Sequence, residues 1–158
     1  MKKILFASFL YLLVTSCGGN ETKTDSSQAS SVSESATSSG NPSYDPKRGE
    51  GKFKDVVVAV TLDATKATQG EKTFGVKCGS CHKLTDEKLV GPGWKGVTSR
   101  HEAPWILNFM TNTDEMLNKD PSAQAQLEIC LVRMPNQNLS DQEALALFEY
   151  MRKNDGVK

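Results

Sequence analysis

The sequence predicts an all-α domain of about four short helices, and three observations support that fold class. Apolar residues recur at the spacing of one helix face in several segments of the second half of the chain. Capping residues stand where these segments begin. No signals of a parallel sheet accompany them. The part expected to fold, residues 44–158, is long enough for one domain and no more.

The first 16 residues are expected to form a lipoprotein signal peptide. Lys2 and Lys3 give a basic start, and residues 4–14 form an apolar run that is too short to span a membrane. Small residues precede Cys17, and this ending resembles a bacterial lipoprotein signal, in which the cysteine is lipidated and becomes the first mature residue. An ordinary signal peptide followed by a chance cysteine is the alternative.

Residues 17–43 are expected to be the lipid-anchored cysteine followed by a disordered, serine-rich tether. Val32 is the only large aliphatic residue in this segment, so too little apolar surface is available to offset the entropy lost on folding. The tether suggests either a head domain that swings between fixed partners or a plain spacer above the lipid. Gly18 and Gly19, with no aspartate directly after the anchor, favour the outer membrane over the inner one by resemblance to known sorting preferences. An exported protein on the periplasmic face is therefore expected.

The charge of the chain is balanced, with 19 Lys and Arg against 19 Asp and Glu. Nothing in that balance suggests nucleic acid as a partner. The chain also has only two histidines and no glycine-rich phosphate loop that follows a strand. The composition therefore does not indicate the chemistry of the protein, which has to be inferred from a small number of motifs.

The first helix is expected to end at a cysteine pair. Four residues fall on one helix face at i, i+3, i+7 and i+11: Ala67, Gly70, Phe74 and Cys78. Asp63 provides one possible start, and Thr68 with Glu71 at capping-box spacing provides another. Before this helix, residues 56–62 are rich in β-branched side chains and predict a short strand or an extended segment.

Two shorter helices are expected in the middle of the chain. Pro104 is tolerated in the first turn of one of them. The apolar residues of that helix keep helical spacing: Trp105, Ile106, Phe109 and Met110. The other begins with Asp120 as N-cap and Pro121 as the first helical residue. Its buried stripe is expected to consist of Ala123, Leu127, Cys130 and Leu131.

The last helix has the clearest signals at both ends. Ser140 and Glu143 have the spacing of a capping box. Arg152 and Lys153 lie in the last turn, where they suit the helix dipole, and Gly156 follows just beyond. The apolar stripe consists of Ala144, Leu147, Phe148 and Met151.

The run Cys78-Gly79-Ser80-Cys81-His82 carries the chemistry. Its C-x-x-C-H spacing is typical of covalent haem attachment, because two thiols can add to the two vinyl groups on one edge of the macrocycle and the histidine can ligate the iron. A disulfide or a thioredoxin-like centre is an alternative, but such a centre lies in a βαβ unit, and this pair ends a helical pattern. A zinc site needs further ligands, and the chain has no second C-x-x-C and no H-x-x-H.

Over residues 62–155 the chain resembles a small mono-haem class I cytochrome c. In that family the first helix crosses the last at a steep angle, and Gly70 and Phe74 match the residues that pack there. Leu147 and Tyr150 match their partners on the last helix. With its lipoprotein start, the chain looks most like cytochromes of Bacteroidota respiratory chains. The resemblance implies a cytochrome c fold around one covalent haem c per chain.

The resemblance also implies the surroundings of the iron. Pro92, at the end of a Leu-Val-Gly-Pro segment, matches the proline whose carbonyl accepts the ring N–H of His82. Met134, directly before a proline and just ahead of the last helix, matches the second axial ligand. Met116, near a loop, is its main rival, while Met110 and Met151 lie in helical stripes.

Four further residues have roles that the sequence leaves open. Trp94 and Trp105 can donate their indole N–H groups to haem propionates or simply pack in the core. His101 is expected to be solvated, with a bis-histidine centre as the alternative. Cys130 is expected to be a buried thiol, with an intermolecular disulfide as the alternative.

Histidine and methionine together fill both axial positions, so the expected function is single-electron transfer in a periplasmic respiratory chain and not enzymatic catalysis. Two alternatives remain: a haem enzyme or gas sensor with an open sixth position, and a fixed wiring subunit of a larger oxidase or reductase. By resemblance, a quinol-oxidising complex is the expected donor, and a terminal oxidase or nitrous oxide reductase is the expected acceptor. The balanced charge leaves open whether a ring of lysines surrounds the haem edge.

Overall fold

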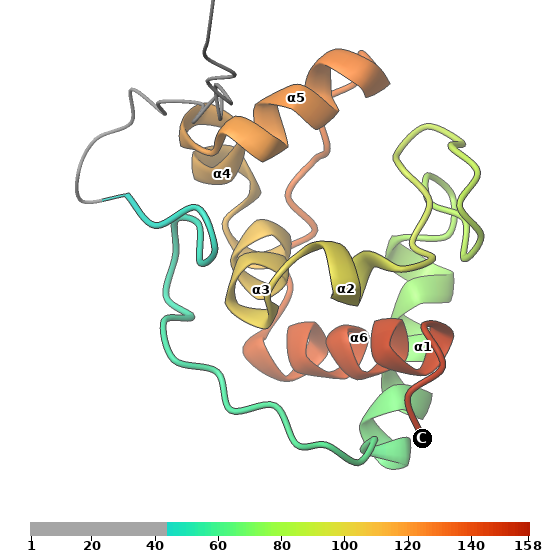
Figure 1. Cartoon of the computed structure of the whole chain (residues 1–158). Coiled ribbons are helices and arrows are strands. Elements are labelled where there is room, and N and C mark those ends of the chain that lie inside the picture. The colour runs from blue at the N-terminus through green and yellow to red at the C-terminus, as the bar shows by residue number, and fades with distance from the viewer. Residues whose placement is uncertain (1–43) are drawn as a thin grey trace, which may run out of the picture. The chain divides into compact units, whose positions relative to one another are not determined.

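The computed structural model describes residues 44–158, which fold into six helices (Figure 1). Their bounds are α1 Ala64–Lys77, α2 Val97–Arg100, α3 Ala103–Thr111, α4 Thr113–Lys119, α5 Pro121–Cys130 and α6 Asp141–Asn154. This part of the chain contains no strand, and its β-type pairing is limited to an isolated bridge between His82 and Lys88. The all-α class is therefore confirmed, with α2 and α4 as two short additions. The expected signal peptide (1–16) and tether (17–43) lie outside the described residues.

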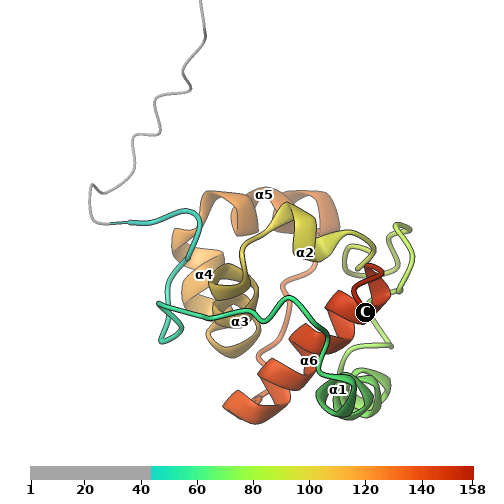
Figure 2. The ribbon, with the colours of Figure 1, turned by 60° about the horizontal axis from the view of Figure 1, so that its bottom comes forward.

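Helices α1 and α6 cross at a steep angle (Figures 1 and 2). A Cβ atom added to Gly70 would lie 2.5 Å from the carbonyl carbon of Ala146 and 2.8 Å from the Cβ atom of Tyr150. The ring centroids of Phe74 and Tyr150 are 5.6 Å apart, and Leu147 is fully buried. Only glycine permits so close an approach, so the pairing expected between these residues is confirmed.

Both crossing helices begin with a side-chain cap. Asp63 accepts a hydrogen bond from the backbone N–H of Lys66 at 3.0 Å, which makes Asp63 and not Thr68 the start of α1. The capping box of α6 is complete: the Ser140 hydroxyl accepts from the Glu143 N–H at 3.2 Å, and the Glu143 carboxylate accepts from the Ser140 N–H at 2.9 Å. Among the helices described, none is both long enough and apolar enough to cross a bilayer.

Helix α3 packs on α6 and leads through α4 to α5 (Figure 1). The helix expected after Pro104 is α3, and the helix expected after Asp120 is α5, where Asp120 accepts from the Ala123 N–H at 2.7 Å. One expectation about α5 is wrong, because Leu131 is 84% exposed. The helix ends at Cys130, and Leu131 adopts the left-handed backbone conformation (φ 61°), which takes its side chain off the apolar face.

Residues 44–62 run over the helices as an irregular, extended segment (Figure 2). The amide of Asn108, fully buried on α3, accepts from the Phe53 N–H at 2.9 Å and donates to the Phe53 carbonyl at 2.8 Å. Arg152 on α6 donates to a backbone carbonyl of the segment at 2.6 Å. Val57 is 99% exposed, so the β-branched side chains here are not buried as they would be in a strand. Of the two expectations for this region, the extended segment is the one observed.

Candidate functional site

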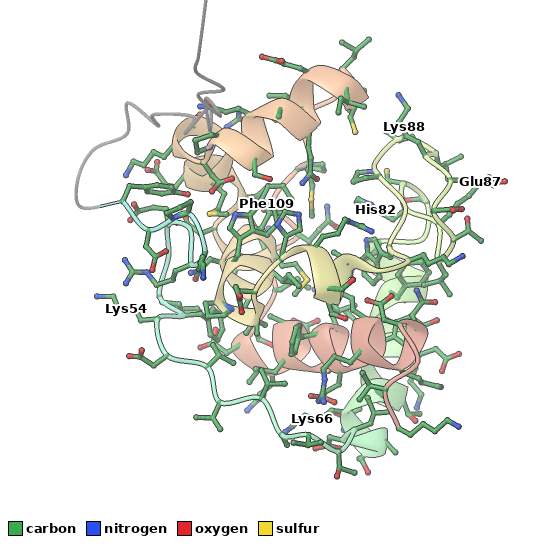
Figure 3. All side chains as sticks on the ribbon, viewed as in Figure 1. Lys54, Lys66, His82, Glu87, Lys88 and Phe109 are labelled. Atoms are coloured by element: carbon green, nitrogen blue, oxygen red, sulfur yellow. The ribbon has the colours of Figure 1, made fainter. Side chains whose placement is uncertain are left out.

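A cavity of about 760 Å³ opens beside the end of α1, between α3, α6 and the loops that follow α1 and α5. Figure 3 shows His82 on one side of this space and Phe109, from α3, on the other. Its walls are largely apolar and include Trp94, Trp105, Ile106, Met110, Leu139 and Met151. A side pocket of about 80 Å³ shares other lining residues with the cavity, among them Cys81, His82 and Phe109. The volume is of the size that cofactor sites occupy.

The turn that ends α1 brings two thiols and an imidazole to the cavity. The backbone N–H groups of Cys81 and His82 both donate to the carbonyl of Cys78, at 3.0 and 2.9 Å. Cys78 is buried and Cys81 is half-buried, and both are free thiols. Burial raises the pKa of Cys78 to about 11, so this thiol is protonated at neutral pH. The cysteine pair and His82 thus face one space, as the spacing in the sequence predicts.

The ring of His82 has a defined orientation and tautomer. Its Nδ1 lies 2.9 Å from the carbonyl oxygen of Pro92. Because a carbonyl can only accept, the ring proton sits on Nδ1, and Nε2 keeps its lone pair. Burial lowers the pKa of His82, and the Pro92 hydrogen bond opposes this only in part, so the neutral ring is favoured. The contact that the resemblance implied between Pro92 and His82 is present.

Gly91 allows the loop to close over this ring. A Cβ atom added there would lie 2.8 Å from Nδ1 and 2.9 Å from Nε2 of His82. The Gly91 N–H also donates to the carbonyl of Cys81 at 2.9 Å, which holds the loop against the cysteine turn. Sequence reasoning named the proline that follows and missed this glycine. The signal was the Gly-Pro pair itself, since this pair marks a turn or loop, and glycine is the residue that permits close approach of the backbone there.

Among the methionines, Met134 reaches the cavity from a loop. It is half-buried and lines both the cavity and the side pocket, as His82 does. Its rival Met116 is fully buried outside the cavity, where its Sδ accepts a hydrogen bond from the Glu50 N–H at 3.0 Å. Met110 and Met151 line the cavity as buried residues of α3 and α6. The structure therefore brings Met134 to the same space as His82 and leaves Met116 in the core.

The two tryptophans line the cavity in different ways. The indole N–H of Trp105 donates to Asp120 Oδ2 at 3.0 Å, so Trp105 contributes its ring and not its N–H to the wall. Trp94 packs edge-on against Phe74, with ring centroids 4.7 Å apart, and its centroid lies 5.8 Å from that of His82. Of the two, Trp94 is the one whose N–H has no hydrogen-bond partner among the described residues.

His101 and Arg100 also line the cavity. The sequence placed His101 there only in the bis-histidine alternative and did not place Arg100 there. His101 stacks on Trp105 with ring centroids 3.8 Å apart and is half-buried, not fully solvated as expected. Burial and then the charge of Arg100 lower the pKa of His101. Arg100 donates to the carbonyl of Gly93 at 3.2 Å. Arg100 ends α2 and His101 is its C-cap. Because α2 is a single turn among polar residues, it has no apolar periodicity by which the sequence could have revealed it.

Cys130 lies at the end of α5 and lines both the cavity and the side pocket. It is a free, half-buried thiol, so it is less buried than its place on the α5 stripe predicts. Its exposure follows from the end of the helix, because no further turn of α5 covers it.

These residues fit a haem. Two free thiols and a neutral imidazole converge on the same apolar cavity, and a thioether reaches it from another loop. Thiols at this spacing form the two covalent links, and imidazole and thioether are established axial ligands of haem iron. The apolar aromatic and aliphatic walls suit the faces of a macrocycle.

Comparison with known proteins agrees with this fit. A family model described as cytochrome c matches residues 67–155, which is more than half of the chain. A cytochrome c from Rhodothermus marinus is 33% identical, with a TM-score of 0.64 over 66% of this chain and 90% of that one. An engineered cytochrome c from the same organism is 32% identical, with a TM-score of 0.66 over 70% and 98%. A further structure of the engineered protein, bound to a carbene intermediate, has a TM-score of 0.64. No curated protein matches the chain.

The matched region extends from α1 to the end of α6 and so contains the helix crossing, the cysteine turn and the cavity. The match covers 90% and 98% of the two solved cytochromes c, so it includes nearly the whole fold of each. The chain therefore belongs to the cytochrome c family, and its domain binds one covalent haem c for electron transfer.

Proposed function

We propose that this protein is a single-electron carrier whose haem is linked to Cys78 and Cys81 and is ligated by His82 and Met134. The observation that carries the proposal is the hydrogen bond of 2.9 Å between His82 Nδ1 and the Pro92 carbonyl. It fixes a neutral imidazole with a free Nε2 in a cavity that both thiols and the Met134 thioether also line. A carrier needs this arrangement, because two protein ligands leave the iron no position for a substrate.

Each residue of the site has a definable task. A bound haem c supplies a one-electron Fe(III)/Fe(II) couple. The Pro92 carbonyl orients His82 and makes it a stronger ligand. As an axial ligand, the soft sulfur of Met134 would stabilise the reduced iron more than a second histidine would. The apolar walls act in the same direction, because they disfavour the extra charge of the oxidised centre.

Spectra of the purified holoprotein test the ligation. With Met134 bound, the oxidised protein shows a sulfur-to-iron charge-transfer band and the reduced protein binds CO poorly. Met134→Ala is expected to lose the band, bind CO and lower the reduction potential. Met116→Leu is the matched control and should keep the band, because Met116 lies outside the cavity. A band that survives in Met134→Ala would overturn the assignment of this ligand.

The same measurements separate the carrier from a haem enzyme or gas sensor. Met134 lies between α5 and α6, outside any helix, which is the observation that favours an open or exchangeable sixth position. Ready CO binding by the unmodified reduced protein, with no sulfur-to-iron band, would support that second function. A stable complex with an oxidase or reductase on purification would instead support a fixed wiring subunit.

The setting of the carrier is also part of the proposal. The pattern of residues 1–17 supports export and lipidation at Cys17, and residues 17–43 would then tether the domain to the periplasmic face of a membrane, with the outer membrane favoured. A quinol-oxidising complex is the proposed donor, and a terminal oxidase or nitrous oxide reductase is the proposed acceptor, in a respiratory chain of the Bacteroidota type. Replacing residues 1–17 by an ordinary cleavable secretory signal without the cysteine should release the mature protein into the soluble periplasmic fraction, and an unchanged membrane fraction would contradict the anchor.

A further inference from the structure

The loop that carries Met134 runs from the end of α5 to the start of α6 (Figure 1), and we call its residues 132–139 the methionine loop. Within the described part of the chain, none of its backbone groups takes part in a backbone–backbone hydrogen bond. Two hydrogen bonds stay inside the loop: Gln137 donates to the Pro135 carbonyl at 3.1 Å, and Asn136 accepts from the Asn138 N–H at 2.9 Å. The polar ties of the loop to other elements therefore come from side chains.

Arg133, directly before Met134, provides the most extensive of these ties. Its Nη2 donates to the carboxylate and to the backbone carbonyl of Asp114, both at 3.2 Å, and to Asn118 Oδ1 at 3.1 Å. Its Nε lies 3.4 Å from the same carboxylate oxygen. The planar guanidinium can serve several acceptors at once, which an ammonium group at the same place cannot do in the same geometry. We call this set of contacts the Arg133 clasp.

The acceptors of the clasp lie on a helix that the core holds in place. Asp114 and Asn118 stand four positions apart on α4, so they share one face of that helix. Between them, Met116 is fully buried and Leu117 is buried as well. Met116 Sδ also accepts from the Glu50 N–H at 3.0 Å. Helix α4 is therefore a firm point of attachment for the methionine loop.

The clasp lies beside the proposed axial ligand. Arg133 and Met134 line the side pocket together with Leu117 of α4 and with His82. The Cα atoms of two consecutive residues are about 3.8 Å apart. A displacement of Arg133 from α4 therefore has to move Met134 as well.

The second polar tie of the methionine loop is weaker. The Lys77 ammonium group lies 3.5 Å from the Gln137 carbonyl oxygen, which is at the outer limit of a hydrogen bond. The same ammonium group pairs with Glu143 at 2.9 Å, so its main partner lies outside the loop. Among the described residues, the Arg133 clasp is thus the principal polar tie of the loop to the rest of the domain.

We propose that Arg133 is a positioning residue, which keeps Met134 on the iron by holding the methionine loop against α4. The inference rests on the proposed ligation by Met134. When the clasp is broken, the loop can carry the thioether away more often, and a small ligand then reaches the vacated position more readily. Because the ion pair of the clasp is exposed to solvent, salt weakens it and should speed the release of Met134.

Imidazole binding to the oxidised holoprotein tests this role. The iron–sulfur bond has to break before an iron–nitrogen bond to imidazole forms, with no change in oxidation state. At saturating imidazole, the rate at which the sulfur-to-iron band disappears therefore levels off at the rate of Met134 release. Arg133→Gln is expected to raise this limiting rate at least about threefold, because it removes the ion pair and most of the donors. A smaller change would overturn the proposal.

Lys153→Gln is the matched control. Lys153 pairs with Glu71 at 3.2 Å, the same distance as in the pair of Arg133 with Asp114. The exposed fractions are also similar, at 48% and 53% against 45% and 63%. The control pair joins α6 to α1, so its loss should leave the limiting rate unchanged. Equal acceleration in both variants would indicate general loosening of the domain and would overturn the proposal.

Variants of both partners assign the effect to the clasp. Arg133→Lys keeps the charge without the planar fork, so its limiting rate should lie between those of the unmodified protein and Arg133→Gln. Asp114→Asn should also accelerate release, but by less, because an amide oxygen still accepts. The double variant Arg133→Gln, Asp114→Asn should be no faster than Arg133→Gln, because both changes remove the same contact. Effects that multiply in the double variant would overturn the proposal.

The sulfur-to-iron band of the unmodified protein separates the two levels of inference. Its absence would overturn the proposed ligation and, with it, the role of Arg133. A band that is present while Arg133→Gln releases Met134 at the unmodified rate would overturn the role of Arg133 alone. Should Arg133→Gln fail to fold, Asp114→Asn, which changes one exposed side chain on α4, carries the same test.

Discussion

At the scale of single residues, one buried carboxylate joins three parts of the domain. Asp120 is fully buried, and its Oδ1 accepts from the Ala123 N–H at 2.7 Å at the start of α5. Its Oδ2 accepts from the Trp105 indole at 3.0 Å and from the Tyr44 hydroxyl. Burial, followed by the hydrogen bond to Asp120, raises the pKa of Tyr44 above its usual range. Asp120 therefore ties the beginning of the folded domain and the first turn of α5 to the wall of the haem cavity.

Replacing Asp120 should be costly. Asp120→Ala removes the α5 cap and leaves the Trp105 N–H buried without a partner, which together should lower the free energy of unfolding by about 2–4 kcal/mol. Tyr44→Phe removes one bond and should lower it by about 1 kcal/mol. Denaturant unfolding of the two holoproteins measures both. Equal losses would show that the cap and the indole bond contribute little.

At the scale of elements, the crossing of α1 and α6 positions the cysteine turn. The close contact at Gly70 sets how near the two helices lie, and the turn of Cys78 to His82 follows directly at the end of α1. The same crossing brings Lys77 of α1 within 2.9 Å of Glu143 in the first turn of α6. The haem-binding turn thus depends on the packing of a helix that lies about sixty residues later in the chain.

Two glycines of α1 provide a matched test of this packing. Gly70→Ala should destabilise the holoprotein by about 2–4 kcal/mol, because the new methyl group would overlap Ala146 and Tyr150. Gly75→Ala should be neutral or stabilising by up to about 1 kcal/mol, because no atom beyond the local helix backbone lies within 4 Å of the new Cβ and alanine favours the helix. Thermal or denaturant unfolding distinguishes the two. A Gly70→Ala protein as stable as Gly75→Ala would refute the steric account.

The capping box of α6 gives the fold a dependence on pH. The Ser140 backbone hydrogen bond and then the Lys77 contact lower the pKa of Glu143 to about 2. A lowered pKa means that ionised Glu143 stabilises the fold fully above its unfolded pKa of about 4.3, and that this contribution is lost as the pH falls toward 2. Glu143→Gln should therefore flatten the fall in stability between about pH 5 and pH 2, as measured by urea unfolding across that range. An unchanged pH dependence would contradict this role.

At the scale of the whole molecule, the haem cavity is a large part of the core. Filling about 760 Å³ in so small a domain is beyond what its own side chains achieve. Leaving even a third of that volume as a dry cavity would cost about 6 kcal/mol, which is comparable with the total stability of a typical domain. The bound haem therefore serves as structural filling as well as redox centre.

Removing both attachment cysteines should unfold most of the domain. A Cys78→Ser, Cys81→Ser chain that carries no haem is expected to lose most of its helix content, because the cavity walls then have nothing to pack against. Far-UV circular dichroism measures this, with a Cys130→Ser holoprotein as the control that keeps its helices. Native helix content in the haem-free chain would contradict the structural role of the cofactor.

Much of this fold could be predicted from short-range patterns. The capping box of α6, the N-cap of α5 and the C-x-x-C-H turn each involve residues within four positions of one another, so local spacing reveals them. The short helices α2 and α4 could not be predicted, because α2 has one turn and α4 seven residues, too few for a clear apolar stripe. Leu131 was misjudged because the α5 stripe continues in the sequence after the helix has ended.

The sequence by itself determined the cysteine turn and the helical class of the domain, since these depend on spacing along the chain, and the places of Pro92 and Met134 were implied by the resemblance to a family. Only the tertiary structure decided that Met134 and not Met116 reaches the cavity, that His101 stacks on Trp105 at its wall, and that Lys77 pairs with Glu143 of α6. The physical reason is that burial and ion pairing depend on contacts between residues far apart in the chain, and local patterns do not record which distant segment will supply the partner.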